Sequence, residues 1–120
     1  MVLFDKMENA LLVARSINYP EGKAFVVEWL GQYYRQKGDN ISALRYYLEL
    51  LEVHGKLGQS ALEQETLFEI AQIYQAEQLN GKALDYYRQL LSTSPRQKEI
   101  WEQMSSVSYT HLTLPTILLV

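Results

Sequence analysis

The chain has 120 residues, of which 48% are hydrophobic and 21% charged, and its formal net charge is −3 at pH 7. This length and composition predict one folded domain. The slightly acidic balance argues against a nucleic-acid partner, because proteins that bind nucleic acid usually carry a basic face. The chain has no cysteine, which excludes a disulfide framework and a thiolate metal site and suits a reducing compartment.

The sequence also argues against a secreted or membrane protein. Charged residues, among them Asp5, Lys6 and Glu8, interrupt the apolar start where a secretory signal needs an unbroken apolar core. No apolar run approaches the roughly 18 residues that a membrane-spanning helix requires. We therefore expect a cytoplasmic protein with no membrane partner.

Apolar residues recur three and four positions apart along most of the chain, which is the spacing of amphipathic helices. The pattern predicts six helical segments: Leu3–Ala14, Ala24–Lys37, Ile41–Val53, Ala61–Glu77, Lys82–Leu91 and Arg96–Met104. Turn residues separate these segments at Asn18–Gly22, Gly38–Asn40, Gly55–Gly58, Asn80–Gly81 and Ser92–Pro95. Because the connections are short, neighbouring helices are predicted to be antiparallel.

One segment of the chain is repeated. Residues Asn40–Leu51 (NISALRYYLELL) return forty positions later as Asn80–Leu91 (NGKALDYYRQLL), and seven of the twelve residues are identical. Repetition at such a period is typical of proteins built from stacked helical repeats. The pattern therefore predicts a row of helical hairpins and not a closed bundle.

The repeated hairpin resembles the tetratricopeptide repeat, which carries an aromatic residue, Leu-Gly and Tyr on its first helix and Ala, an aromatic residue and a final Pro on its second. The first copy offers Leu30-Gly31, Tyr34, Ala43 and Tyr47, and the second offers Ile70-Ala71, Tyr74, Ala83, Tyr87 and Pro95. The resemblance implies an all-α fold, a right-handed α-solenoid of antiparallel helical hairpins. The common repeat has about 34 residues, so the offset of forty indicates the longer variety. We expect longer helices joined by the Gly55–Gly58 turn, and shorter spacing after Pro95.

The resemblance assigns a packing role to a set of small, apolar and aromatic residues. The set is Leu30, Gly31, Tyr34, Ala43, Tyr47, Leu50, Ile70, Ala71, Tyr74, Ala83, Tyr87, Leu90, Pro95 and Trp101. Small residues let two helix backbones approach, and the tyrosines fill the space between hairpins. Overpacking in Gly31→Leu is predicted to lower stability by roughly 1–3 kcal/mol, and the cavity in Tyr47→Ala by about 3 kcal/mol. The second tyrosine of each Tyr-Tyr pair is predicted to face the packing, which favours core packing over base stacking.

These patterns predict five parts of the chain. They are the second helix of a partial repeat (1–18), two repeats (22–58 and 59–95), the start of a further repeat (96–105) and an irregular or non-native tail (106–120). The tail segment VSYTHLTLPT resembles translated sequencing-adapter read-through, and the alternative is a short strand or an irregular cap. The partial first repeat suggests a fragment of a longer array.

No catalytic or metal-binding constellation is present in the sequence. His54 is predicted to close a helix and interact with its dipole, and His111 lies in the doubtful tail. The carboxylate pairs Glu49/Glu52 and Glu63/Glu65 are explained better by solvated helix faces. There is no metal-spaced histidine pair, catalytic triad order or phosphate-binding glycine loop, so we expect no enzyme activity, cofactor or metal.

The resemblance implies a groove lined by the first helix of each repeat. The residues that it places there are Phe25, Glu28, Gln32, Arg35, Gln36, Glu65, Phe68, Gln72 and Gln75. Amides can hydrogen-bond a peptide backbone, and Phe68 can anchor an apolar side chain. Some members of the family clamp chaperone C-termini, but Glu28 and Gln32 stand where that clamp needs Lys or Asn, which disfavours such a partner.

The expected function is therefore a protein–protein interaction scaffold that binds a peptide or helix of a partner. The alternative is a regulatory arm of a larger signalling enzyme or transcription regulator whose effector domain lies outside this sequence. RNA binding is disfavoured by the charge. The exposed ends of the repeat array provide a route to self-association.

Overall fold

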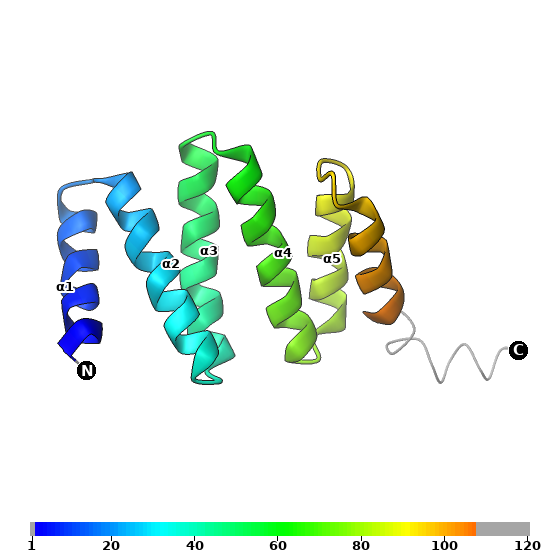
Figure 1. Cartoon of the computed structure of the whole chain (residues 1–120), viewed down its shortest axis with the longest axis horizontal. Coiled ribbons are helices and arrows are strands. Elements are labelled where there is room, and N and C mark those ends of the chain that lie inside the picture. Colours follow the sequence, from blue (N-terminus) through cyan, green and yellow to red (C-terminus); the bar gives the residue numbers. More distant parts are fainter. Residues whose placement is uncertain (1, 108–120) are drawn as a thin grey trace, which may run out of the picture. The chain divides into compact units, whose positions relative to one another are not determined.

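The structure is a computed structural model that describes residues 2–107. Five helices follow one another: α1 (Val2–Ser16), α2 (Pro20–Gln36), α3 (Asn40–Lys56), α4 (Ser60–Ala76) and α5 (Asn80–Leu91), as Figure 1 shows. Residues 97–107 form a further helical segment. Residues 2–107 contain no strand, so the predicted all-α fold class of helical repeats is confirmed. The adapter-like residues 108–120 lie outside the described part.

The chain divides into two compact units, Met1–Thr66 and Leu67–Val120. The division falls inside α4, whose first residues belong to the first unit. In the first unit, α2 packs against both α1 and α3. Each unit has its own buried apolar core and is described by itself below.

One turn geometry recurs every twenty residues. Helices α2, α3 and α4 are each 17 residues long, and the helices from α2 to α5 begin at residues 20, 40, 60 and 80. The turn before each of them contains one residue with positive φ, namely Asn18 (54°), Gly38 (83°), Gly58 (68°) and Gln78 (63°). The forty-residue offset in the sequence is thus two helices with their turns.

The turn before α3 shows why so short a connection is sufficient. The backbone N–H of Asp39 donates to the carbonyl of Tyr34 (2.9 Å), and that of Gly38 donates to Arg35 (3.1 Å), which closes α2 with a Schellman motif. The Asp39 carbonyl then accepts the first helical bond of α3 from Ala43 (3.1 Å). Asp39 therefore takes part in the end of α2 and in the start of α3. The same pair of bonds closes α1, α3 and α4.

Three predicted boundaries are wrong. Pro20 begins α2, because proline is favoured in the first helical turn, where its missing N–H has no partner to lose. Gly55 lies inside α3, since the turn needs its positive φ only at Gly58. Ser106 and Val107 continue the last helical segment, and Val107 is only 2% exposed. Burial of Val107 outweighs the weak helix propensity of its neighbours.

The core of the first unit is formed by apolar faces of α1, α2 and α3. Its buried residues include Leu11, Ala14, Val26, Val27, Leu30, Ala43, Tyr47, Leu50 and Val53. Glu49 of α3 ties the three helices together at the surface, since it pairs with Arg15 of α1 and, at 3.2 Å, with Lys23 of α2. Burial raises the pKa of Glu49, but hydrogen bonds from these two cations outweigh it and hold the pKa below its ordinary value.

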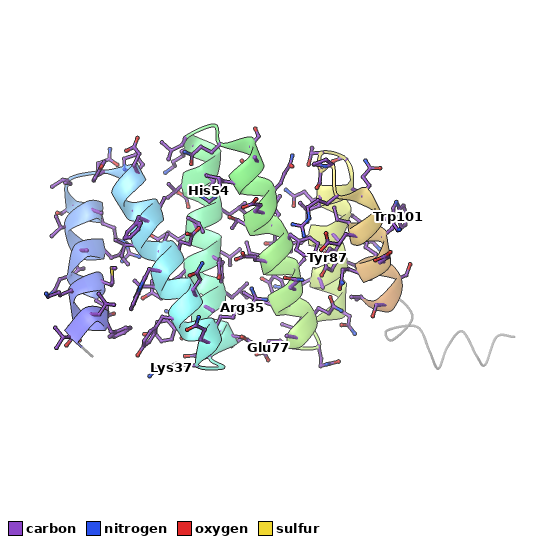
Figure 2. All side chains as sticks on the ribbon, viewed as in Figure 1. Arg35, Lys37, His54, Glu77, Tyr87 and Trp101 are labelled. Atoms are coloured by element: carbon purple, nitrogen blue, oxygen red, sulfur yellow. The ribbon has the colours of Figure 1, made fainter. Side chains whose placement is uncertain are left out.

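The core of the second unit comes from α4, α5 and residues 97–107. Its buried residues include Leu67, Ile70, Ala71, Ile73, Ala83, Leu84, Tyr87, Leu90, Ile100, Met104 and Val107. Figure 2 shows the Tyr87 side chain in the second unit. The Tyr87 hydroxyl donates to the Gln75 side-chain carbonyl at 2.9 Å, which joins α4 to α5.

Candidate functional site

Helix α2 separates a packing face from a polar face. Val27 and Leu30 are fully buried, and Gly31 is buried beside them. A Cβ added to Gly31 would lie 3.3 Å from the Tyr47 ring, so the missing side chain lets α2 and α3 approach. Gly31 and Tyr47 therefore have the packing role that the sequence predicts.

The polar face of α2 carries three of the residues predicted to bind a partner. Glu28, Gln32 and Gln36 are all exposed and stand four residues apart, so they lie on one side of the helix. None of them makes a hydrogen bond or an ion pair within residues 2–107. We call these three residues the α2 polar row. Phe25 is also exposed, by 65%, whereas Arg35 is half-buried.

The equivalent residues of α4 behave differently, and one prediction is wrong. Phe68 is only 5% exposed, because its ring meets the edge of Tyr87 at 5.8 Å and lies under the Arg96 guanidinium at 4.3 Å. It is a core residue and not a free anchor for a partner. Gln75 is half-buried and accepts the Tyr87 hydrogen bond. Glu65 remains exposed and Gln72 half-exposed.

Most of the predicted packing residues are buried. Leu30, Gly31, Ala43, Tyr47, Leu50, Ile70, Ala71, Tyr74, Ala83, Tyr87 and Leu90 all lie in the cores, and Tyr34 is half-buried. Pro95 is exposed in the loop after α5. Trp101 is 56% exposed, and Figure 2 shows it pointing away from its helical segment. Its neighbour Ile100 is fully buried, so Ile100 and not Trp101 belongs to the core.

A stacked contact between two tyrosines on neighbouring helices recurs in both repeats. Tyr34 of α2 stacks on Tyr46 of α3 with ring centroids 5.7 Å apart, and Tyr74 of α4 stacks on Tyr86 of α5 at 5.5 Å. Burial raises the pKa of the Tyr34, Tyr46 and Tyr86 hydroxyls. These rings are occupied by each other, which supports core packing.

An aromatic cluster in the first unit was not anticipated. Phe4 of α1 stacks on Tyr33 of α2 at 4.7 Å and meets the edge of Tyr34 at 5.9 Å. Trp29 of α2 also stacks on Tyr33, with ring centroids 5.4 Å apart. The repeated segment contains neither Phe4 nor Trp29, so the repeat does not predict this cluster. Their helical spacing within α1 and α2 was the available signal.

His54 is a buried residue of the first unit and lies in the last turn of α3. It is 4% exposed, and its Nδ1 lies 3.1 Å from the Thr66 hydroxyl, which donates its own proton to the Leu62 carbonyl (2.9 Å). The hydroxyl therefore accepts from the Nδ1–H of a neutral ring. Burial lowers the pKa of His54, and the contact with the helix dipole stays a prediction.

The described part holds neither a metal cluster nor a membrane span. Residues 2–107 contain no group of three or more His, Asp or Glu side chains placed to hold a metal ion. None of the described helices is long and apolar enough to cross a bilayer.

Repeated helical hairpins with identical turns, small residues at the helix contacts and buried tyrosines define a helical-repeat protein. Residues 64–97 match the family model of the tetratricopeptide repeat, which supports a repeat of the tetratricopeptide type. Among curated proteins, no sequence matches the chain. Tetratricopeptide repeats generally mediate protein–protein interactions and are typically not catalytic.

Proposed function

We propose that the chain is a protein–protein interaction scaffold that binds a peptide or helix of a partner through the exposed side of α2. The observation that carries the proposal is the α2 polar row. Glu28, Gln32 and Gln36 are exposed and unpaired within residues 2–107, while the opposite side of α2 is fully packed.

The chemistry of the α2 polar row suits a polypeptide ligand. Glutamine side chains both donate and accept hydrogen bonds, as the backbone of an extended peptide requires. Glu28 adds a negative charge that favours a basic segment and disfavours a terminal carboxylate. Glu65 of the first unit is exposed and stays a further candidate. In the second unit, taken by itself, Gln72 stays a candidate, whereas Phe68 is buried and Gln75 is bound to Tyr87.

We expect the α2 polar row to be dispensable for folding. Surface substitutions away from caps and ion pairs usually change stability by less than about 0.5 kcal/mol. A combined Glu28→Ala, Gln32→Ala, Gln36→Ala variant should therefore unfold at the same denaturant concentration as the parent chain. This separates a loss of binding from a loss of structure.

The proposal is tested by affinity capture from cell extract with quantitative mass spectrometry. The triple variant is compared with the parent chain and with a control, Gln89→Ala with Glu102→Ala, which removes exposed polar side chains that make no hydrogen bond or ion pair within residues 2–107. We expect specific partners of the parent chain to be lost from the triple variant and kept by the control. Equal capture by all three proteins would refute the proposal.

A further inference from the structure

An apolar groove opens in the first unit between the C-terminal half of α1 and the N-terminal half of α2. Its volume is about 520 Å³, which lies within the range of about 300–1,000 Å³ seen for ligand pockets. Three large apolar side chains among its lining residues are mostly exposed: Val13 by 57%, Ile17 by 64% and Phe25 by 65%. We call this feature the α1–α2 groove.

Two small residues line the α1–α2 groove, and the equivalent residues of the next repeat are larger. Ala10 and Ala14 line the groove. Forty residues later, the equivalent residues are Leu50 and His54, which are buried at 2% and 4% exposure. At the Ala10 position both later copies carry a buried leucine, Leu50 and Leu90, whereas the last copy has the small residue Ser94 at the Ala14 position. The space beside Ala10 is therefore where a large side chain supplied from outside fits.

Tyr19 and Gly22 shape the end of the groove near the turn before α2. Both line it, and a Cβ added to Gly22 would come within 2.6 Å of the Tyr19 ring. The absence of a side chain at Gly22 thus lets the Tyr19 ring lie against the α2 backbone. Tyr19 is 51% exposed and presents an aromatic wall with a polar tip, a common feature of protein interfaces.

The charge of the groove is set by Glu21. It is the charged residue among those that line the groove, and it makes no ion pair within residues 2–107. The nearby cations Arg15 and Lys23 are both bound to Glu49 on α3, so they do not neutralise it. An apolar groove with an unpaired carboxylate on its lining favours an apolar ligand that carries a positive charge.

We propose that the α1–α2 groove binds a short segment of a partner protein in which a large apolar side chain stands next to lysine or arginine. The apolar side chain fills the space above Ala10 and Ala14, and the cation pairs with Glu21. The inference rests on the proposed function in that the ligand is a polypeptide. It places the ligand against α1 and the N-terminal half of α2, whereas the α2 polar row runs from Glu28 to Gln36.

The test uses the full chain and three short fluorescein-labelled peptides. One has a central Phe-Leu pair flanked by lysines, the second has glutamates in place of the lysines, and the third has Ala-Ala in place of Phe-Leu. The plug variant Ala10→Leu installs the residue found at position 50, and both residues are strong helix formers. Ala61→Leu, at an exposed alanine of α4, makes the same change outside the groove.

We expect fluorescence anisotropy to show binding of the lysine peptide that weakens at least about tenfold in Ala10→Leu, because the anchor loses its burial. Ala61→Leu should bind like the parent chain. Glu21→Gln should weaken binding about two- to fivefold, as the loss of an exposed ion pair implies. The glutamate and Ala-Ala peptides should bind more weakly than the lysine peptide.

Unchanged binding in Ala10→Leu would overturn the groove assignment, while the α2 polar row would still stand or fall by its own capture experiment. Failure of all three peptides to bind would overturn it as well. Light scattering measures whether the parent chain forms a dimer. A dimer of the parent chain that dissociates in Ala10→Leu would mean that a second copy fills the groove, which would also overturn the proposal.

Discussion

The hairpins α2–α3 and α4–α5 share one packing solution and expose different chemistry. Tyr47 and Tyr87 occupy the same place in the two repeats and are 1% and 0% exposed. Their first helices carry a small residue at equivalent positions, Gly31 in one and Ala71 in the other, and both are buried. The shared contact is therefore steric, and it explains why these positions recur in the sequence.

The two hairpins differ one turn before that contact. Glu28 is exposed on α2, whereas its equivalent on α4 is Phe68, which is buried under Arg96. One repeat thus leaves a polar side chain for solvent or a partner, and the other closes the same position with an aromatic core residue. The two hairpins therefore differ in the chemistry that they expose at this position.

The largest effect is expected from removing the shared tyrosine. Tyr87→Ala should lower the free energy of unfolding by about 3–5 kcal/mol, because it leaves a cavity among buried side chains and removes the hydrogen bond to Gln75. Urea unfolding followed by circular dichroism measures the loss. Tyr87→Phe keeps the ring and should lose only about 1 kcal/mol. Equal losses in both variants would show that the hydroxyl, and not the ring, holds the contact.

The difference between Phe68 and Glu28 gives the next largest effect. Phe68→Ala should lower stability by about 3 kcal/mol, because the ring is buried against Tyr87 and Arg96. Glu28→Ala should change it by less than about 0.5 kcal/mol. Thermal unfolding of the two variants checks the pair. A Phe68→Ala variant as stable as the parent would restore Phe68 as a surface residue.

The burial of Phe68 shows what the sequence alone leaves out. Helical spacing predicts which side of α4 each residue occupies, and it placed Leu30, Tyr47 and Ile70 correctly in the core. It does not predict that Arg96, which follows the loop after α5, lies over the Phe68 ring. Contacts between distant segments decide whether a residue at the edge of an apolar face is covered.

The helices were predictable, and their ends were not. Apolar periodicity identified all six helical segments because each buries one face. The turns were misplaced where Gly and Pro served as markers, since Pro20 lies within α2 and Gly55 within α3. Asn18 and Gln78 adopt the positive φ that Gly38 adopts elsewhere. The turn that recurs every twenty residues is therefore a backbone feature that no single residue type marks.

Gly31→Leu tests the shared steric contact from the side of α2. The Gly31 Cα faces the Tyr47 ring so closely that a Cβ would lie 3.3 Å away, and a larger side chain must displace the ring. We expect a loss of roughly 1–3 kcal/mol in urea unfolding. Gly81 of α5 has no atom within 4 Å of an added Cβ, so Gly81→Ala is the control and should stabilise slightly.

The two hairpins also differ in the side-chain cap at the start of their second helix, and a substitution can introduce this cap into the hairpin that lacks it. The Asp39 side chain accepts the Ser42 N–H at 3.2 Å and caps α3, whereas Leu79 at the start of α5 offers no side-chain cap. Leu79→Asp should therefore stabilise the chain by about 0.5–1 kcal/mol, and Asp39→Ala should destabilise it. Melting temperatures measure both. A drop in Leu79→Asp would show that the apolar contacts of Leu79 matter more than the missing cap.

The smallest expected effect on stability at pH 7 comes from His54, because its side chain is uncharged at this pH in the folded chain. Burial lowers its pKa below 6.5, more than Glu28, Glu63 and Glu65 raise it. The unfolded chain then binds more protons as the pH falls below about 6.5, so the free energy of unfolding decreases with falling pH. Glu49, whose pKa is lowered below 4.5, titrates under more acidic conditions and leaves this window to histidine.

Unfolding measured between pH 7 and pH 5 isolates the contribution of His54. The slope of stability against pH should flatten in His54→Gln, whose amide has no proton to gain in this range and can still donate to Thr66. His111→Gln, measured beside it, accounts for the other histidine of the chain. A slope that persists in His54→Gln and vanishes in His111→Gln would assign the titration to the tail. The equivalent position in the preceding repeat is Ala14, so this pH response is another property that one hairpin has and its relative lacks.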